Sequence, residues 1–453
     1  MASGNALYGR TEARGPRARG REKPREGVEP RAAVLEAVAG WVPGEPVPNG
    51  ALPTEWEVDD AWVRTRTGIA GRHRAAPGMS TGDIAYEAAR LLVAEAPGLA
   101  GTGAGVGAGE GAGFGAASAA AAAASARTGG ARGVDAVVLA TATPDHLCPG
   151  TAPALAARLG LGTVPAFDIG AVCSGFVYGL AVCHGLVVSG LYDRVLLVGA
   201  DVYSTWLDPR DRSSGVVFGD GAGAALIGAG RAGDQGELLA FDLGSDGTGY
   251  DLITVPGGGA RSRSVAEPPA EGDEFFRMRG RAVYQHAVER MTGSCRSLLR
   301  AVGWDAAEID HFVPHQANAR ILRAVAERVG IGVQRCVTHL DRVGNTGAAS
   351  IPLALADADA RGRFRAGDRM LLTAFGGGLT WGTVALRWPV TTTPALTMSQ
   401  ATTPAAAAPT TSTPAASMPA AAMPEATTPA TTTSEAARPE HSRATALDGR
   451  NGS

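Results

Sequence analysis

Two cysteines in the stretch FDIGAVCSGFVYGLAVCHGLVVSG, which runs from Phe167 to Gly190, draw attention to thiol chemistry. The apolar run at 167–172 predicts a buried strand, and the small apolar residues at 175–188 predict a helix. Cys173 lies at their junction, where unpaired N–H groups and the helix dipole favour an anion, so we expect its thiol to be partly ionised near neutral pH. Cys183 falls on another face of the helix, nearly three turns on, which predicts a packing role.

Three further segments place polar groups where strands end. The segment IDHFVPHQANARIL puts His315, Gln316 and Asn318 between a strand and a helix, and HLDRVGNTGAASIPLAL puts Asn345 in a glycine-flanked turn before a helix. The segment LLTAFGGGLTWG ends a strand in Gly376–Gly378, whose backbone N–H groups no side chain shields. Each segment alone has an ordinary explanation as a structural histidine, a turn residue or a tight bend. Their joint occurrence favours a site at the carboxyl ends of the strands.

The composition predicts a folded protein with appendages. The chain has 453 residues, 45% of them hydrophobic, which suffices for a sizeable core. A net charge of −3 and a pI near 6.3 provide no overall attraction to nucleic acid or to an anionic membrane. The arginine-rich N-terminus lacks an apolar signal segment, and no run approaches the ~18 apolar residues of a membrane span. We therefore expect a cytoplasmic protein.

A metal site is not expected. Five cysteines without regular spacing form neither a disulfide framework nor a CxxC pair. The spacing of His311 and His315 suits one face of a helix, whereas this segment is predicted to be a strand that contains Pro314.

Biased composition divides the chain into segments. Residues 1–30 are rich in Gly, Pro and Arg, and residues 390–453 are rich in Thr, Pro and Ala, so both are predicted to be disordered. The glycine- and alanine-rich stretch at 98–133 resembles a phosphate-binding loop, but its glycines from Gly101 to Gly115 fall only on odd positions and never give G-x-G-x-x-G. We interpret it as a flexible insertion.

The remaining chain alternates between strand and helix patterns. The segment STGDIAYEAARLLVAEA is predicted to be a helix, with Ser80 and Asp83 in capping-box spacing. The segments VDAVVLATAT and YDRVLLVGAD are predicted to be buried strands, and ARILRAVAERVG a helix that ends at Gly330. This alternation predicts an α/β fold with a largely parallel sheet.

Six stretches resemble a known family in order along the chain: DDAWVRTRTGI, DIGAVCSGF, DPRDRSSGVVFGDGAGAA, VPHQANARI, DRVGNTGAAS and AFGGGLTWG. Across nearly all of residues 31–389 the chain resembles β-ketoacyl-(acyl carrier protein) synthase III, a condensing enzyme with the thiolase fold. The resemblance implies two similar α/β halves, residues 31–230 and 231–389, whose sheets pack in a layered αβαβα arrangement.

The resemblance also implies a reaction and a catalytic set. Cys173 would accept an acyl group from acyl-CoA, and splitting the condensation into acylation and carbon–carbon bond formation lowers each barrier. The carbanion would come from decarboxylation of malonyl-acyl carrier protein, with His315, as a neutral donor, and Asn345 as hydrogen-bond donors to its thioester carbonyl. The backbone N–H groups of Cys173 and Gly377 would bind the oxyanion. No metal or redox cofactor is implied, and the product would start fatty acid or polyketide synthesis.

Substrate-binding residues are implied in the same way. The ring of Trp62 would stack on the adenine of coenzyme A between Arg66 and Arg212, although Trp62 also suits an ordinary core position. Asn318 matches a residue at the pantetheine tunnel. An acidic carrier protein would dock on a helix surface that carries three arginines whose spacing only partly shares one face, so a merely solvated surface is the alternative. They are Arg320, Arg323 and Arg328.

Cys148 marks a departure from the family pattern. In DHLCPGTA it stands where the family often has a bulky aromatic residue that reaches across a homodimer and limits the acyl pocket. The smaller side chain predicts room for a longer or branched starter group.

Three other functions compete with condensation as explanations of the pattern. An acyltransferase would pass the acyl group from Cys173 to an alcohol or amine without decarboxylation, and a non-catalytic partner of a condensing enzyme would lack the nucleophile. A papain-like protease also uses Cys, His and Asn, but the α/β pattern and the acyl-CoA motifs argue against it. The intact set of Cys173, His315 and Asn345 favours condensation.

Overall fold

The computed structural model of the chain describes residues 30–95, 133–265, 270–389 and 397–398. Nearly all of the predicted N-terminal extension at 1–30, of the insertion at 98–133 and of the Thr/Pro/Ala-rich tail lies outside these residues, so the predictions for these segments stay untested. None of the described helices combines the length and the apolar composition that a membrane span needs.

The first large sheet comes almost entirely from the N-terminal half of the described chain. β7 runs antiparallel to its neighbours β1 and β6, while β6, β4 and β5 run parallel to one another. In the described residues the spatial order is β14 (Thr397–Met398), β1 (Arg31–Val42), β7 (Gly221–Arg231), β6 (Arg194–Asp201), β4 (Ala136–Ala140), β5 (Ala166–Ile169).

The second large sheet repeats this order with the C-terminal strands. Its described strands lie in the order β11 (His311–Pro314), β12 (Arg369–Gly376), β13 (Thr380–Arg387), β8 (Leu238–Ser245). An isolated parallel β-bridge joins Phe312 of β11 to Cys336. If β11 corresponds to β4, this bridge stands where β5 pairs with β4 in the first sheet. In this comparison β8 corresponds to β1, β13 to β7, and β12 to β6. The two halves of the chain therefore share one topology.

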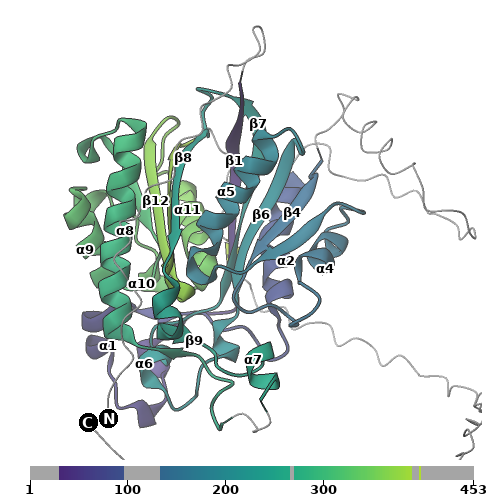
Figure 1. Ribbon diagram of the computed structural model, residues 1–453. Helices are drawn as coiled ribbons and strands as arrows, with labels where there is room; N and C mark the ends of the chain where they lie inside the picture. Colours follow the sequence, from purple (N-terminus) through teal and green to yellow (C-terminus); the bar gives the residue numbers. More distant parts are fainter. Residues whose placement is uncertain (1–29, 96–132, 266–269, 390–396, 399–453) are drawn as a thin grey trace, which may run out of the picture. The chain divides into compact units, whose positions relative to one another are not determined.

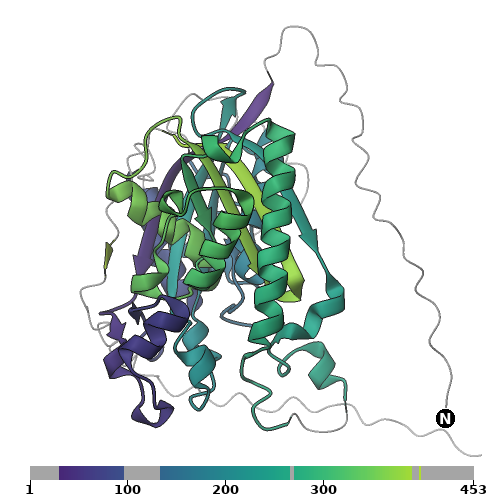
Figure 2. The same ribbon diagram turned by 90° about the vertical axis from the view of Figure 1, so that its left-hand side faces the viewer.

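Helices fill the space between the sheets and cover their outer faces (Figure 1). α5 (Gly175–Val188) and α11 (Ser350–Ala360) lie between the sheets, and α5 contacts strands of both. α2 (Thr81–Glu95) and α4 (Ala152–Arg158) cover the first sheet, and α8 (Gly280–Val302), with α9 (Ala319–Val329) beside it, covers the second (Figure 2). The layers therefore follow the order αβαβα of the thiolase fold.

The hydrophobic core explains why most residues of the two inner helices are apolar. A helix packed between two sheets turns little of its surface to water, so it needs only a few polar residues. Phe176, Leu180 and Cys183 of α5 are buried with Leu355 of α11 and strand residues of both sheets. The packing role predicted for Cys183 is confirmed, since its side chain is fully buried.

Short elements gather at one end of the two sheets, in the lower part of Figure 1. In this region β2 pairs with β3 and β9 pairs with β10. The elements are β2 (Val47–Pro48), α1 (Asp60–Thr67), β3 (Gly71–Arg72), α6 (Arg212–Gly215), β9 (Ile253–Thr254), α7 (Ala260–Arg263), β10 (Arg277–Met278) and α10 (Leu340–Val343). Two of them, β9 and β10, border the cavity described below.

Local predictions are confirmed at helix ends and corrected at one strand. The Ser80 N–H donates to Asp83 Oδ2 at 2.8 Å and the Asp83 N–H donates to Ser80 Oγ at 3.3 Å, which is the predicted capping box. α9 ends at Val329, and Gly330 follows it in the left-handed region, with φ 93°. The prediction of a buried strand at 167–172 is wrong for β5, because this strand pairs on one side only and leaves Phe167 39% exposed.

Candidate active site

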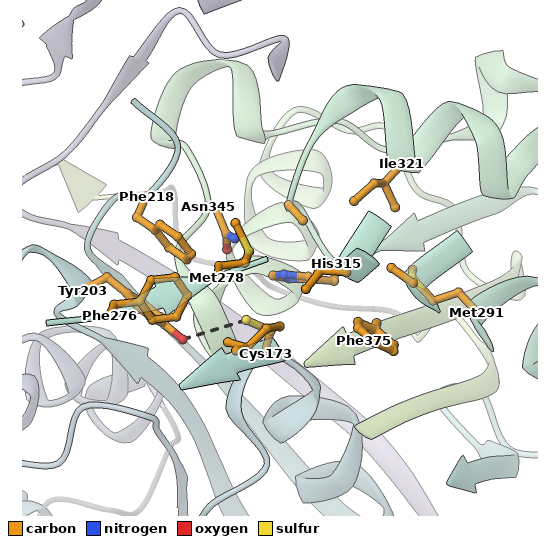
Figure 3. A pocket seen from close by; sticks show the side chains of 14 residues that line it. Cys173, Tyr203, Phe218, Phe276, Met278, Met291, His315, Ile321, Asn345 and Phe375 are labelled. Atoms are coloured by element: carbon orange, nitrogen blue, oxygen red, sulfur yellow. Dashed lines mark hydrogen bonds between the residues drawn. The ribbon is translucent and has the colours of Figure 1, made fainter. Parts of the chain in front are cut away.

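Side chains from both halves line a partly enclosed cavity of about 50 Å³ (Figure 3). Cys173, His315 and Asn345, the three predicted catalytic residues, all border it. The rest of the lining is almost entirely apolar. One part is an aromatic wall of Tyr203, Phe218 and Phe276, and another part is formed by Met291, Ala317 and Ile321.

Cys173 is held at the start of a central helix by a close approach of two backbones. It lies in a single 3₁₀ turn, Val172–Ser174, which leads directly into α5. A Cβ atom on Gly376, at the end of β12, would lie 2.9 Å from the backbone nitrogens of both Cys173 and Ser174. Only glycine therefore fits there, and Val172 adopts the strained φ of 47°.

Burial determines the protonation of the Cys173 thiol. Its pKa is raised to about 12, chiefly by burial and to a smaller extent by the nearby Asp201, while the Tyr203 hydroxyl and the cysteine's own N–H act in the opposite direction. The predicted junction of strand and helix is present, but the expectation of a partly ionised thiol at neutral pH is wrong. Loss of hydration outweighs the field at the helix end.

His315 follows β11 and is oriented by a serine at the start of α11. Its Nδ1 lies 2.6 Å from Ser350 Oγ, which also accepts a hydrogen bond from the Gln316 N–H at 3.3 Å. Nε2 is then the ring nitrogen left for the cavity. Burial lowers the pKa of His315 to about 4, so the ring is neutral at pH 7.

Asn345 is fixed by its neighbours on both backbone and side chain. Its N–H donates to the Val217 carbonyl at 2.9 Å, and its carbonyl accepts from the Gly219 N–H at 2.9 Å. The side-chain Oδ1 accepts from the Gly347 N–H at 3.0 Å. Because the amide oxygen is engaged in this way, the Nδ2 group is the donor that Asn345 offers to the cavity.

The glycine turn after β12 lies against the turn that carries the nucleophile. Gly377 opens a 3₁₀ segment, Gly377–Leu379, in which Gly378 has φ 73°. A Cβ atom on Gly377 would lie 3.2 Å from Val172 Cγ2. This proximity suits the predicted pairing of the Cys173 and Gly377 N–H groups as oxyanion donors.

Three of the four residues predicted to bind coenzyme A lie together. The Arg66 guanidinium lies 4.2 Å from the centroid of the partly exposed Trp62 ring, and that of Arg212 lies 5.7 Å from it. The fourth residue, Asn318, links two helices, and its predicted place at the pantetheine tunnel stays a prediction. It caps α9, because its Oδ1 accepts from the Arg320 N–H at 2.9 Å, and its Nδ2 donates to the Arg66 carbonyl at 3.2 Å. Asn318 therefore joins α9 to α1.

The remaining predicted residues lie at the surface. Arg320, Arg323 and Arg328 are exposed on α9, and Arg320 Nη2 donates to the Thr65 carbonyl at 3.0 Å. Arg328 lies in the last turn of α9, five residues beyond Arg323 and thus on another face. Cys148 is exposed and does not border the cavity of the single chain.

Sequence reasoning missed two polar residues of the site. Ser350 stands five residues after Asn345, inside a segment already singled out, but nothing in the pattern pairs it with His315. Tyr203 stands two residues beyond the predicted strand at 192–201, so the rule that sites form at the carboxyl ends of strands would have found it. Tyr203 Oη lies 3.9 Å from Cys173 Sγ.

Comparison with known proteins decides the family. One curated relative, "Beta-ketoacyl-[acyl-carrier-protein] synthase III 5" of Streptomyces coelicolor, is 48% identical over 79% of this chain and 98% of its own length. The chain belongs to the β-ketoacyl-[acyl-carrier-protein] synthase III family. The family profile described as "3-Oxoacyl-[acyl-carrier-protein (ACP)] synthase III" matches residues 167–247 of this synthase III chain, and its C-terminal counterpart matches residues 299–388.

Solved structures of synthase III proteins have the same fold. The crystal structure of "3-oxoacyl-(acyl carrier protein) synthase III, FabH from Pseudomonas aeruginosa PAO1" is 45% identical, with a TM-score of 0.66 over 79% of this chain and 98% of that one. The "Priming beta-Ketosynthase from the R1128 Polyketide Biosynthetic Pathway" is 28% identical, with a TM-score of 0.66 over 81% of this chain and 99% of that one. The two profile matches divide the cavity, because Cys173 lies in one and His315 and Asn345 lie in the other.

Proposed function

We propose that this chain condenses an acyl-CoA starter with malonyl-acyl carrier protein through an acyl-Cys173 intermediate, releasing CoA and CO₂. The observation that carries the proposal is the meeting of a thiol and two oriented hydrogen-bond donors, Cys173, His315 and Asn345, on one partly enclosed apolar cavity. Family membership supports the same reaction. The product is a 3-oxoacyl carrier protein that starts fatty acid or polyketide synthesis.

The first half-reaction loads Cys173. Its sulfur attacks the thioester carbonyl of the acyl-CoA, the bond to the CoA sulfur breaks, and the thiol proton ends on the released CoA. The N–H groups of Cys173 and Gly377 receive the developing oxyanion, each contributing on the order of 3 kcal/mol. Because the lining is almost entirely apolar, water competes little with these donors.

The second half-reaction forms the carbon–carbon bond. Loss of CO₂ from the malonyl group places negative charge on its thioester oxygen, and His315 Nε2–H and Asn345 Nδ2–H donate hydrogen bonds to that oxygen. A neutral histidine suits this role, and burial keeps His315 neutral at pH 7. The carbanion then attacks the acyl group and releases the Cys173 sulfur. No base is required, because decarboxylation generates the carbanion.

Coenzyme A binds over Trp62 in this proposal. Two guanidinium groups already lie close to the ring, and stacking of a base on an aromatic ring contributes roughly 1–3 kcal/mol. Arg320 and Arg323, exposed on the neighbouring α9, present positive charge to an acidic carrier protein. Arg328 lies on another face of that helix and contributes less to such a surface.

A homodimer through β5 is part of the proposal. β5 is an edge strand of the first sheet, and Phe167 on it and Leu147 in the nearby loop are 39% and 70% exposed. Asp168 of β5 accepts hydrogen bonds from the Thr151 and Ala152 N–H groups at 2.7 Å, so the loop that bears Cys148 lies at this edge. A second copy that pairs there would cover these side chains. Light scattering of Phe167→Asp should show a monomer where the native chain gives a dimer.

The size of the cavity favours a short starter group. A cavity of about 50 Å³ has room for only a few heavy atoms, since one water needs roughly 10–15 Å³ on this measure. Its wall of Tyr203, Phe218 and Phe276 belongs to the same chain as Cys173. The longer or branched starter predicted from Cys148 therefore requires space that a partner chain would supply.

One mass-spectrometric experiment tests the proposal. The protein is incubated with acetyl-, propionyl-, isobutyryl- and hexanoyl-CoA, and CO₂ release from malonyl-acyl carrier protein is measured in parallel. We expect one acyl adduct that is lost in Cys173→Ala and kept in Cys148→Ala, which removes an exposed thiol. Asn345→Ala should keep the adduct and lose CO₂ release.

The outcomes separate the alternatives. An adduct that passes to an alcohol or amine without CO₂ release would establish an acyltransferase instead. A folded protein that forms no adduct and releases no CO₂ would identify a non-catalytic partner. Full condensation by Cys173→Ala would exclude the proposed mechanism.

A further inference from the structure

Tyr203 is held rigidly beside the proposed nucleophile. It opens a 3₁₀ turn, Tyr203–Thr205, two residues after β6 ends, and its side chain is fully buried. The ring stacks on Phe218 with centroids 4.6 Å apart and meets Phe276 edge-on at 5.8 Å. A Cβ atom on Gly347 would lie 2.5 Å from Tyr203 Cε2, so the ring occupies the space that a side chain at 347 would need.

The hydroxyl of Tyr203 points at the sulfur. Tyr203 Oη lies 3.9 Å from Cys173 Sγ, within hydrogen-bond range for sulfur (Figure 3). In the described part of the chain this hydroxyl has no other hydrogen-bond partner. Buried phenol hydroxyls nearly always have a partner, so the sulfur fills that role here.

The charge on the sulfur determines which atom donates, because a thiolate has no hydrogen and can only accept. Burial raises the pKa of Tyr203 well above its usual range, with Asp201 and Cys173 adding to the effect, so the phenol keeps its proton. A protonated phenol beside a thiolate is a charge-assisted donor, roughly twice as strong as the same contact with a neutral thiol. Tyr203 therefore favours the ionised sulfur over the protonated one.

Neither of the other ionisable groups near the sulfur, Asp201 and His315, stabilises a negative charge on it in the way that Tyr203 does. Asp201, at the end of β6, raises the pKa of Cys173. His315, from the other half, is neutral and has Nδ1 engaged with Ser350. The donors available to an ionised sulfur are thus the cysteine's own N–H and the Tyr203 hydroxyl.

We propose that Tyr203 is a catalytic residue that donates a hydrogen bond to Cys173 Sγ whenever the sulfur carries negative charge. In acyl loading the bond stabilises the thiolate that attacks the acyl-CoA. The thiol proton goes to the leaving CoA sulfur, and Tyr203 keeps its own proton throughout. In condensation the same bond stabilises the thiolate that leaves the acyl group. The inference rests on the proposed function and adds a group to its mechanism.

Tyr203→Phe tests the proposal, because it removes the hydroxyl and keeps the ring. The first readout is the second-order rate of Cys173 alkylation by iodoacetamide between pH 6 and 9.5, followed by peptide mass. The second is the rate of acyl loading from acetyl-CoA. We expect both rates to fall by about 10-fold at pH 8, since a hydrogen bond to a charged group is of this magnitude, and alkylation to require a higher pH.

The matched control is Tyr178→Phe. The Tyr178 hydroxyl donates to the Gly244 carbonyl at 2.8 Å and does not border the cavity, so both rates should stay unchanged. Urea unfolding of both variants shows whether they fold equally well. Equal chain-length preference in Tyr203→Phe and the native protein would exclude a change in cavity shape as the cause.

Two results separate this inference from the proposed function. If Tyr203→Phe is alkylated and acylated at native rates over the whole pH range, Tyr203 has no catalytic role and the synthase function stands. If the native protein takes no acyl group from any acyl-CoA, the proposed function fails. The alkylation comparison would then still decide whether Tyr203 lowers the pKa of the thiol.

Discussion

Ser350 Oγ lies 2.6 Å from His315 Nδ1 and accepts a hydrogen bond from the Gln316 N–H at 3.3 Å. With that N–H already donating to it, the hydroxyl can use its own hydrogen to donate to Nδ1. The proton of the neutral ring then resides on Nε2, which is the donor that the condensation step requires. A single serine thus selects the tautomer of the histidine.

Replacing Ser350 should separate the two half-reactions. In Ser350→Ala we expect CO₂ release and condensation to fall by about 10-fold, the order of one lost hydrogen bond, while acyl loading of Cys173 stays near native. Ser294→Ala is the control, because Ser294 is a buried serine that donates to Asp242 Oδ1 at 2.6 Å and does not border the cavity. Equal losses in both half-reactions would show that Ser350 acts only through folding.

The buried neutral His315 should make stability depend on pH. Its pKa of about 4 in the folded state is below the ordinary value of 6.5, so between these values the unfolded chain binds more protons. Stability then falls as pH drops from about 6.5 to about 4. Between pH 7.5 and pH 4.5 the native protein should lose about 2 kcal/mol more unfolding free energy than His315→Asn, because the variant has no histidine to protonate at this position. Urea titrations at the two pH values measure this double difference, and a constant difference would contradict the prediction.

The Trp62 ring should bind the adenine of coenzyme A without taking part in chemistry. We expect Trp62→Ala to raise KM for acetyl-CoA by about 10-fold with little change in kcat, consistent with the loss of one stacked base. Loading from an acyl-pantetheine, which has no adenine, should stay native. Trp304→Ala is a close control, because Arg369 and Arg387 lie 5.4 and 5.7 Å from the Trp304 ring in a similar arrangement elsewhere. A KM increase that is the same for both acyl donors would argue against adenine stacking.

Phe276 should limit the length of the starter group. It is buried in the aromatic wall, 4.9 Å from Phe218 between ring centroids. Phe276→Leu removes part of this wall and should shift acyl loading toward longer chains in a competition among acetyl-, butyryl- and hexanoyl-CoA. Phe364→Leu removes a buried ring that packs on Trp388 and does not border the cavity, so its preference should match the native protein. Unchanged selectivity in Phe276→Leu would place the limit elsewhere.

Much of the site could be predicted because its residues carry local signals. The order of strand, nucleophile and helix around Cys173, the turn at Asn345 and the glycines after β12 are all evident in short segments. The protonation of Cys173 was predicted wrongly, since the helix end is local whereas burial depends on side chains from both halves. The link between Ser350 and His315 joins residues 35 positions apart, and no pattern in a single sequence reveals it. The prediction that β5 is buried was wrong for a similar reason. The order of the strands in the sheet places β5 at an edge, and a short segment does not reveal that order.

The repeated topology divides the reaction between the two halves. The nucleophile stands before α5 in the first half, and His315 and Asn345 belong to the second, which begins after β7 ends at Arg231 and before β8 starts at Leu238. A chain cut between these residues would give one fragment with a thiol and no enolate donors and another with donors and no thiol. Neither fragment alone could catalyse condensation. Recovered condensation activity would therefore report directly that the two fragments have reassembled.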